Sequence, residues 1–492
     1  MNTIPAWEAG LRQSDLLAFV KRLQDNGLNM HSVLLARHGK CFFERYWEPF
    51  DADTPHRMYS VTKSFVSIAI GCLVDEGKLN LDDPIIRYFP DKLPEVVPQE
   101  LKEQTIRDML MMCTCFAGGK WFQPGVTDRT AWYFAQKPDR PSGTLFHYDS
   151  TGSYVLGVLV ERLSGMGLLE YLRRKVLDEI GGFENAEILE TPDGTPWGDS
   201  ALLCTPRDLM RFARFVMQKG MWEGRQLVSR AYVEAATSRQ TDNNLENGVH
   251  YNRFGYGYQF WMTAQDGFSF NGMGGQFAVC LPQKDLIFVC TGDNQLASAE
   301  KSPVIFDALF ECIVSRLQDE PLAQEEPLRL PERKLPCVQG EADCETAARI
   351  AGKWFVCKDN RMQITRFRLD FPREDEGVFT YVNAQGEKQL PFGFGKNVFG
   401  LFPQLGYSDQ RGNVHEITDF RYRCASSAGW IDGNKLRLHV HIIDRYFGQL
   451  AVTFGFRGNA AGVRMVKSAE DFLDEYEGWL SACLEQDNET EA

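Results

Sequence analysis

The chain has 492 residues, of which 43% are hydrophobic and 24% charged, and its net charge is −14 at pH 7. This composition is typical of a soluble globular protein with more than one domain. The acidic balance argues against nucleic-acid or anionic-membrane partners. No apolar run reaches the roughly 18 residues of a membrane span, and residues 1–20 lack the pattern of a secretory signal. We therefore expect a cytoplasmic protein whose thirteen cysteines are reduced thiols.

The first 318 residues alternate between strand and helix patterns, which predicts a mixed α/β domain over residues 1–318. Apolar runs around Gly39 predict a hairpin, and a second pair of strands surrounds the turn Pro282–Asp285. Helical periodicity and capping residues predict five helices. They follow Ser60 or begin near Thr105, Ser153, Thr205 and Val304.

A change of composition separates this region from the rest of the chain. Residues 319–340 carry four prolines among many charges, which is typical of a semi-extended linker. Beyond them, residues 435–443 and 449–456 alternate strictly between apolar and polar. We predict an antiparallel β domain over residues 341–492, either a small barrel or a sandwich. Residues 468–484 are predicted to form a terminal helix.

Motifs for metals and nucleotide cofactors are missing from the sequence. Cys113 and Cys115 form C-x-C rather than C-x-x-C, and the pair His415-Glu416 lacks the second histidine of H-E-x-x-H. The glycine-rich phosphate-binding loops and the G-x-S-x-G elbow are absent as well. We therefore expect neither a metal nor a cofactor.

The stretch Ser60-Val61-Thr62-Lys63 opens a segment that is apolar nearly all round, as in a buried helix. Ser60 would lie at the helix N-terminus, where free N–H groups favour a serine alkoxide. Lys63 lies one turn further on the same face, and partial burial would prepare it to accept a proton. The alternative is a capping serine followed by an exposed lysine. A second S-x-x-K at Ser298–Lys301 lies in polar surroundings and is attributed to chance.

Six stretches of the sequence, considered together and in their order along the chain, match the pattern of one protein family. They are residues 58–91, 105–113, 146–165, 199–229, 255–261 and 271–293. In this order they resemble the penicillin-recognising serine hydrolases, in particular the class C β-lactamase-related enzymes, which include D-alanyl-peptidases, esterases and 6-aminohexanoate-dimer hydrolases. The resemblance implies a β-lactamase-like fold, with an antiparallel sheet flanked by helices and an all-α region. It also implies a nucleophilic Ser60 paired with Lys63.

The second family motif, Y-x-N, falls on Tyr148-Asp149-Ser150. The resemblance makes Tyr148 the phenol that carries a proton between Ser60 and the leaving group. The alternative is a core aromatic whose hydroxyl caps the following helix. Ser150 replaces the asparagine of the motif and could still donate to Lys63 or to a substrate amide, although its reach is shorter.

The third family motif, K-T-G or H-x-G, falls on Phe270-Asn271-Gly272 and therefore lacks its basic residue. That residue usually anchors a substrate carboxylate. The resemblance assigns Asn271 and Gly272 to the strand that lines the site, and Met273 supplies a backbone N–H that joins the N–H of Ser60 in an oxyanion hole. The alternative for these glycines is a tight bend in a strand.

Residues 120–138 form an aromatic insertion relative to the family pattern. We expect four aromatic side chains to line an apolar acyl or amine pocket, with local core packing as the alternative. They are Trp121, Phe122, Trp132 and Tyr133.

These observations predict a serine hydrolase that forms an acyl-enzyme on a small ester or amide. Because the basic residue of the third motif is missing, a carboxylesterase or amidase is favoured over a β-lactamase or D-Ala carboxypeptidase. One alternative is a catalytically silent ligand-binding protein with the penicillin-binding fold. Another is a lipocalin-like carrier built from the C-terminal domain, where His439 and His441 are expected to be a polar surface pair. We expect that domain to shape the cleft or to mediate homo-oligomer formation, and the sequence leaves both open.

Overall fold

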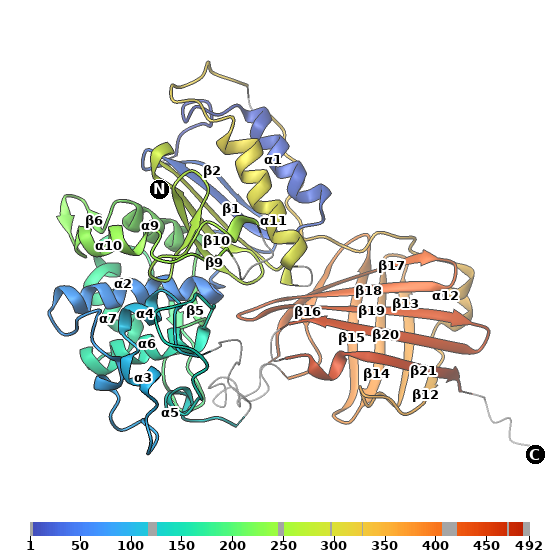
Figure 1. Ribbon diagram of the computed structural model, residues 1–492. Helices are drawn as coiled ribbons and strands as arrows, with labels where there is room; N and C mark the ends of the chain where they lie inside the picture. The colour runs from blue at the N-terminus through green and yellow to red at the C-terminus, as the bar shows by residue number, and fades with distance from the viewer. Residues whose placement is uncertain are drawn as a thin grey trace, which may run out of the picture. The chain divides into compact units, whose positions relative to one another are not determined.

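The computed structural model describes residues 3–116, 125–244, 250–295, 298–326, 328–405, 421–469 and 472–485. They form two compact units, of which the first extends to Lys334 and the second begins at Leu335 (Figure 1). Among the described residues, no helix combines the length and the hydropathy needed to cross a bilayer. All thirteen cysteines are free thiols.

The first unit is built on an antiparallel sheet with the strand order β2-β1-β11-β10-β9-β8. Its strands are β1 (Met30–Arg37), β2 (Lys40–Tyr46), β8 (Trp261–Thr263), β9 (Gly267–Gly272), β10 (Gln276–Leu281) and β11 (Leu286–Gly292). Both predicted hairpins are present, since β1 pairs with β2 and β10 with β11. His38 and Gly39 have φ values of 50° and 71°, the left-handed pair that a two-residue hairpin turn requires.

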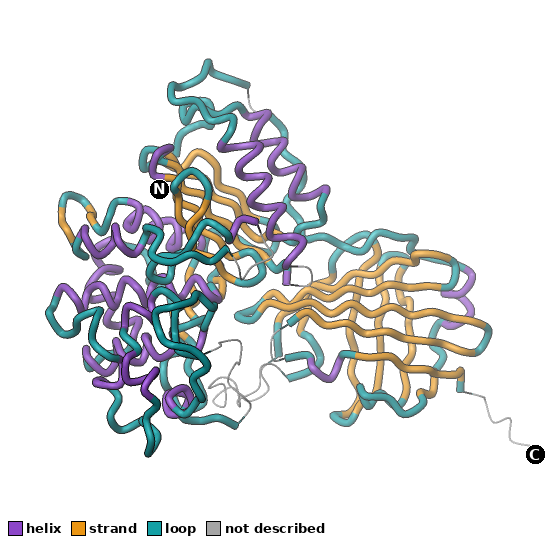
Figure 2. The backbone as a smooth tube through the Cα atoms, viewed as in Figure 1, coloured by secondary structure: helices purple, strands orange, loops and turns teal. Residues whose placement is uncertain are grey.

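Helices cover both faces of this sheet, as the family resemblance implies (Figure 2). Helix α1 (Gln13–Asp25) and helix α11 (Ser298–Ala308), which continues as a π-helical turn over Leu309–Val314, bury their apolar sides against β1, β10 and β11. The other face is covered by α9 (Pro206–Met217), where the ring of Phe212 lies 6.1 Å from that of Phe270 on β9.

Helix α2 (Thr62–Asp75) occupies the centre of the helical region, and every side chain from Thr62 to Leu73 is buried, as predicted. The other helices of this region are α3 (Gln99–Glu103), α4 (Ile106–Leu110), α5 (Arg129–Phe134), α6 (Ser150–Ser164), α7 (Leu168–Leu172), α8 (Asp178–Ile180) and α10 (Arg230–Ala236). Small strands complete it: β3 (His56–Arg57), β4 (Glu187–Ile188), β5 (Leu202–Cys204), β6 (Met221–Trp222) and β7 (Arg225–Gln226). The predicted caps Thr105 and Thr205 both form capping boxes.

The second unit is a closed β-barrel. Its strands follow the order β15-β14-β13-β12-β21-β20-β19-β18-β17, and a parallel pairing of β15 with β17 closes the ring while β16 adds to β17. The strands are β12 (Phe355–Cys357), β13 (Arg366–Arg373), β14 (Glu376–Asn383), β15 (Gly386–Phe394), β16 (Val398–Leu401), β17 (Arg423–Asp432), β18 (Lys435–Ile443), β19 (Phe447–Arg457), β20 (Ala460–Ser468) and β21 (Gly478–Leu484). One short helix, α12 (Glu345–Ile350), precedes them. The predicted antiparallel β domain is thereby confirmed, and of its two predicted forms the structure has the barrel.

The predicted terminal helix is wrong. Residues Asp474–Tyr476 form a single 3-10 turn, and β21 then fills the place between β12 and β20 in the barrel. Leu480 and Ala482 are buried while their neighbours are not, so burial along this segment has the period of a strand.

The proline-rich segment is divided between the two units. Its first part lies along the first unit, where the Glu325 carboxylate accepts the N–H of Gln13 and the carbonyl of Pro331 accepts the guanidinium of Arg45. In the second unit, His441 donates to the carbonyl of Pro336 at 2.9 Å. His441 is 2% exposed, so the expected surface pair is wrong for this histidine.

Candidate active site

Ser60 lies in a strained turn at the start of α2. Residues Tyr59–Val61 form a 3-10 turn that runs into the helix, and Tyr59 has φ 47°, in the left-handed region that non-glycine residues rarely adopt. The pairing of β3 with β5 fixes the chain just before it, and the N–H of Met58 donates to the carbonyl of Leu202. This arrangement leaves Ser60 half-buried above a helix that is itself buried.

Lys63 is the hydrogen-bond partner of Ser60. Its Nζ donates to Ser60 Oγ at 3.0 Å and to the main-chain oxygen of Asp199 at 2.7 Å. The lysine is 1% exposed, so the alternative of an exposed lysine beside a capping serine does not hold. Both acceptors are neutral oxygens, so the amine of Lys63 contacts the hydroxyl of Ser60 while forming no direct bond to a carboxylate of the described residues.

Tyr148 lies beside the same amine. The Nζ of Lys63 is 5.2 Å from the centroid of the Tyr148 ring, and the ring stacks on Trp261 at 5.5 Å and 23°. The following helix, α6, is capped by the side chain of Asp149, which accepts the N–H groups of Thr151 and Gly152. The phenol is consequently not the helix cap. Ser150 is half-buried in the first turn of α6, and its hydroxyl makes no hydrogen bond to the described residues.

The end of β9 packs directly against the turn that carries Ser60. A Cβ on Gly272 would lie 2.3 Å from the main-chain oxygen of Met58, so only glycine permits this approach. Met273 follows at 37% exposure. Asn271 donates to the Oδ1 of Asn252 at 3.0 Å. Phe270 is fully buried, and the position where the family has its basic residue therefore belongs to the core.

A buried charged cluster lies behind Lys63, and the sequence did not predict it. The carboxylate of Asp199 is fully buried and accepts no hydrogen bond from the described residues. Burial raises the pKa of Asp199 to about 6, while the cations of Lys63, Arg129 and Arg57 oppose that shift. Arg57 donates to the main-chain oxygen and to the hydroxyl of Ser200, both at 3.0 Å.

Trp197 contacts both arginines of this cluster. The guanidinium carbons of Arg57 and Arg129 lie 5.0 and 4.8 Å from its ring centroid, within the range of a cation–π contact. The sequence offered one local signal, since Asp199 stands two positions before the apolar run 201–204. Its distance of 136 positions from Lys63 concealed the contact.

The predicted aromatic pocket is described only in part. Trp121 and Phe122 lie outside the described residues. Trp132 is half-buried on α5. Tyr133 is fully buried, its hydroxyl accepts from Gln104 at 2.9 Å, and its ring meets Phe116 edge-on at 5.0 Å. These contacts are those of the core alternative. Trp261, which stacks on Tyr148, was not among the predicted residues.

The geometry unites a hydroxyl, an amine and a phenol at one point, which is a combination suited to nucleophilic catalysis. The amine is within hydrogen-bond reach of the hydroxyl, and the phenol ring faces the amine. Among the described residues, no group of three or more His, Cys, Asp or Glu side chains is arranged as metal ligands would be.

Comparison with known proteins places these residues in a family. The sequence model of the beta-lactamase family matches residues 18–298. A 6-aminohexanoate-dimer hydrolase from Paenarthrobacter ureafaciens is 25% identical over 283 residues, which cover 52% of this chain and 71% of that protein. Esterase EstB from Burkholderia gladioli is 27% identical over 199 residues, or 34% of this chain and 50% of that one.

A similar fold is present among solved structures. EstCE1, a hydrolase with promiscuous acyltransferase activity, aligns with a TM-score of 0.50 at 16% identity, covering 61% of this chain and 100% of its own. At this identity the likeness concerns the fold alone.

Proposed function

Since the chain belongs to the beta-lactamase family of serine hydrolases, we propose that it cleaves a small ester or amide through an acyl-enzyme on Ser60. The observation that carries this proposal is the hydrogen bond of 3.0 Å between Lys63 Nζ and Ser60 Oγ. A buried amine this close to a serine is one of the known means of activating a hydroxyl nucleophile.

The proposed reaction has two steps. Lys63 and Tyr148 accept the proton of Ser60 while its oxygen attacks the substrate carbonyl, and the N–H groups of Ser60 and Met273 stabilise the oxyanion. The tetrahedral intermediate collapses as Tyr148 protonates the leaving alcohol or amine. Water then attacks the acyl-enzyme while Lys63 and Tyr148 accept its proton. The intermediate collapses as this proton passes to Ser60 Oγ, which releases the acid and restores Ser60.

The side chains around Ser60 favour an esterase or amidase over a β-lactamase or carboxypeptidase. Phe270 is buried where the family has the cation that binds a substrate carboxylate. Ser150 supplies a shorter and less versatile group than asparagine. The names of two relatives, a 6-aminohexanoate-dimer hydrolase and an esterase, are consistent with amide or ester substrates.

Intact mass spectrometry tests the proposal. The protein is incubated with a fluorophosphonate, a panel of p-nitrophenyl esters and benzylpenicillin, and the adduct is mapped by peptide digestion. We expect an adduct on Ser60 with the fluorophosphonate and the esters, and none in Ser60→Ala. Ser315→Ala is the matched control, because this exposed-site hydroxyl donates only to the carbonyl of Glu311. Equal signals from wild type and Ser60→Ala would instead support the silent ligand-binding alternative.

The barrel is proposed to assist the hydrolase rather than to carry a ligand. A lipocalin-like carrier needs an empty interior, whereas aromatic rings pack against one another inside this one. The ring centroids of Phe367 and Phe454 are 5.6 Å apart, and those of Phe379 and Phe454 are 5.1 Å apart. Self-association through this domain remains a proposal, and light scattering of the full chain tests it.

A cytoplasmic location is also proposed. Its support is the thirteen cysteines, all of which are free thiols. Fractionation of cells that express the full-length protein, followed by immunoblotting, measures the compartment directly.

A further inference from the structure

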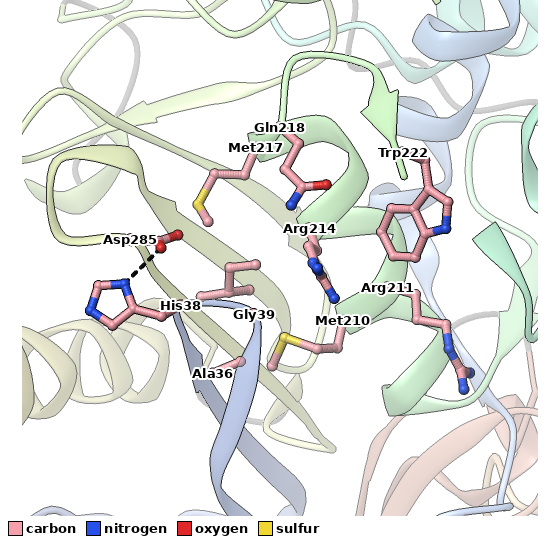
Figure 3. Close-up of a pocket in the computed structure, with 11 residues that line it drawn as sticks. Ala36, His38, Gly39, Met210, Arg211, Arg214, Met217, Gln218, Trp222 and Asp285 are labelled. Atoms are coloured by element: carbon pink, nitrogen blue, oxygen red, sulfur yellow. Dashed lines mark hydrogen bonds and ion pairs between the residues drawn. The ribbon is translucent and has the colours of Figure 1, made fainter. Parts of the chain in front are cut away.

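A pocket lies at the end of the sheet opposite Ser60. Strand register fixes this separation, because Met30 pairs with Gly292 near the Ser60 end and Arg37 pairs with Leu286 at the other end. Seven residues of extended chain span about 23 Å. The pocket has a volume of about 450 Å³ and opens between the two hairpin turns, α9 and the β6–β7 hairpin (Figure 3).

The floor of this pocket is apolar and one of its walls is aromatic. Met210 and Met217 come from α9, Ile287 comes from β11, and Trp222 comes from the β6–β7 hairpin. Figure 3 shows Arg214 between the ring of Trp222 and the turn at Gly39. A Cβ on Gly39 would lie 3.1 Å from the guanidinium, so the turn glycine leaves room for this arginine.

Within the described part of the chain, Arg214 has no anionic partner. Its guanidinium carbon lies 5.0 Å over the Trp222 ring, and its Nε is buried without a hydrogen bond. Among the described residues, no carboxylate or carbonyl accepts from the guanidinium of Arg214. A partly desolvated cation without a protein acceptor is well suited to pair with an anionic ligand.

Two other charged residues of the lining have partners of their own. Asp285 lines the pocket but bonds to His38 at 2.9 Å, and Arg211 pairs with Asp208 at 3.4 Å. Among the lining residues, the cations Arg211 and Arg214 outnumber the single carboxylate of Asp285, so the lining has a net positive charge, and among the described residues only Arg214 of these two arginines has no carboxylate partner. A planar guanidinium matches a carboxylate with two parallel hydrogen bonds, and an adjacent tryptophan suits a flat apolar body.

We propose that this pocket binds a small organic anion, whose carboxylate pairs with Arg214 and whose flat apolar part lies against Trp222 and the methionines. The proposal concerns a site separate from Ser60, and it holds whether or not the hydrolase activity is confirmed. It assigns a ligand class to a part of the fold that the proposed reaction does not use.

Calorimetric titration tests the proposal, with 2-naphthoate as the probe and 2-naphthamide as its neutral counterpart. We expect wild type to bind 2-naphthoate at least about tenfold more tightly than 2-naphthamide, because an ionic bidentate pair is lost in the amide. Arg214→Gln should weaken naphthoate binding at least about tenfold and leave the amide unchanged. Arg214→Lys should fall between, since it keeps the charge but not the fork.

Three controls separate this site from the others. Arg225→Gln, an exposed arginine on the same hairpin paired with Glu179, should bind like wild type. Protein labelled at Ser60 with a fluorophosphonate, or the Ser60→Ala variant, should also bind like wild type. Thermal melts establish that Arg214→Gln is folded. Equal naphthoate affinity in wild type and Arg214→Gln, or loss of binding when Ser60 is blocked or replaced, would overturn the proposal.

Discussion

The two units of the molecule bury different kinds of side chain. The first unit buries charged groups: Arg37, Arg45, Arg57, Lys63, Arg129, Asp149, Asp199, Asp208 and Asp293. In the described part of the barrel, residues 335–405, 421–469 and 472–485, no Asp, Glu, Lys or Arg is buried. The buried polar groups there are Thr346, Thr380, Gln404, Ser426, Ser427, His441 and Gln449.

This difference indicates where unfavourable burial lowers the folding stability of each unit. A buried charge loses its hydration, and partners recover that loss only in part. In the first unit Lys63, Asp199 and two arginines gather behind Ser60, so the least favourable burial coincides with the proposed chemistry. The barrel is held together by aromatic and aliphatic packing instead. Substitutions of Lys63 and Tyr148, which touch the proposed reaction, should therefore change activity more than stability, and substitutions in the barrel should show the opposite.

The largest effect is expected for Lys63→Met. Methionine fills a similar volume but cannot accept or donate the proton of Ser60, so kcat/KM should fall about 10³-fold, within the range of general acid–base catalysis. Steady-state hydrolysis of a p-nitrophenyl ester measures the loss. Lys301→Met is the matched control, because that lysine of the second S-x-x-K donates only to the carbonyl of Gly27. A Lys63→Met enzyme that kept a tenth of the wild-type rate would remove the amine from the mechanism.

Tyr148→Phe should follow, with a loss of about 10²-fold in kcat. The phenyl ring keeps the stacking on Trp261 and the contact with Lys63, so the melting temperature should stay within about 2 °C. Steady-state hydrolysis of a p-nitrophenyl ester and thermal melts of both proteins measure these two effects. Unchanged kcat with a lowered melting temperature would make Tyr148 a packing residue.

The elements predicted from sequence were those that local contacts specify. The hairpin at Gly39, helix α2, and the capped helices α4 and α9 each carry their signal within a few residues. The contact of Lys63 with Asp199 joins residues 136 positions apart and has no local signature. The helix predicted over residues 468–484 was wrong for a related reason. The place between β12 and β20 that this segment fills is a property of the whole barrel.

The candidate site shows the same division. Ser60 and Lys63 lie one helical turn apart, and their contact was predicted from this spacing together with the apolar segment that follows and the family resemblance. The arginine cluster on Trp197 and the stacking of Trp261 on Tyr148 require the tertiary fold to bring together segments that are far apart in the sequence. Tyr133 could not be assigned to pocket or core from its sequence, since the decisive partner is Gln104 on another element.

Gly272→Ala in the first unit can be compared directly with a matched glycine substitution in the barrel. The new Cβ would stand 2.3 Å from the main-chain oxygen of Met58 and push β9 away from Ser60. We expect kcat/KM to fall about tenfold or more and the free energy of unfolding of the first unit to fall by about 1–3 kcal/mol. Gly462→Ala on β20 is the control, because nothing lies within 4 Å of its Cβ position. Equal activity in the two variants would place the end of β9 outside the site.

The smallest effect on activity, and the clearest on pH dependence, is expected for Asp199→Asn. Burial raises the pKa of Asp199 to about 6, against a reference value of 3.8. As pH rises, the unfolded chain therefore releases this proton at a lower pH than the folded protein does. Between these two pH values the folded state binds more protons, and its stability therefore decreases as pH rises through this interval. Above pH 6 this loss of folding stability is complete, and it amounts to about 3 kcal/mol in the free energy of unfolding.

Asparagine resembles the protonated carboxyl, so Asp199→Asn should be more stable than wild type by about 3 kcal/mol at pH 7.5 and nearly equal to it at pH 4. Urea unfolding at both pH values measures this difference. Asp432→Asn, at an exposed carboxylate of the barrel whose pKa is lowered by a hydrogen bond from the backbone of Asn434, should show no such gain. Should Asp199→Asn be destabilised at pH 7.5, the ionised carboxylate must instead be neutralising Lys63, Arg57 and Arg129, and the buried charges of the first unit would then stabilise its fold as well as serve its chemistry.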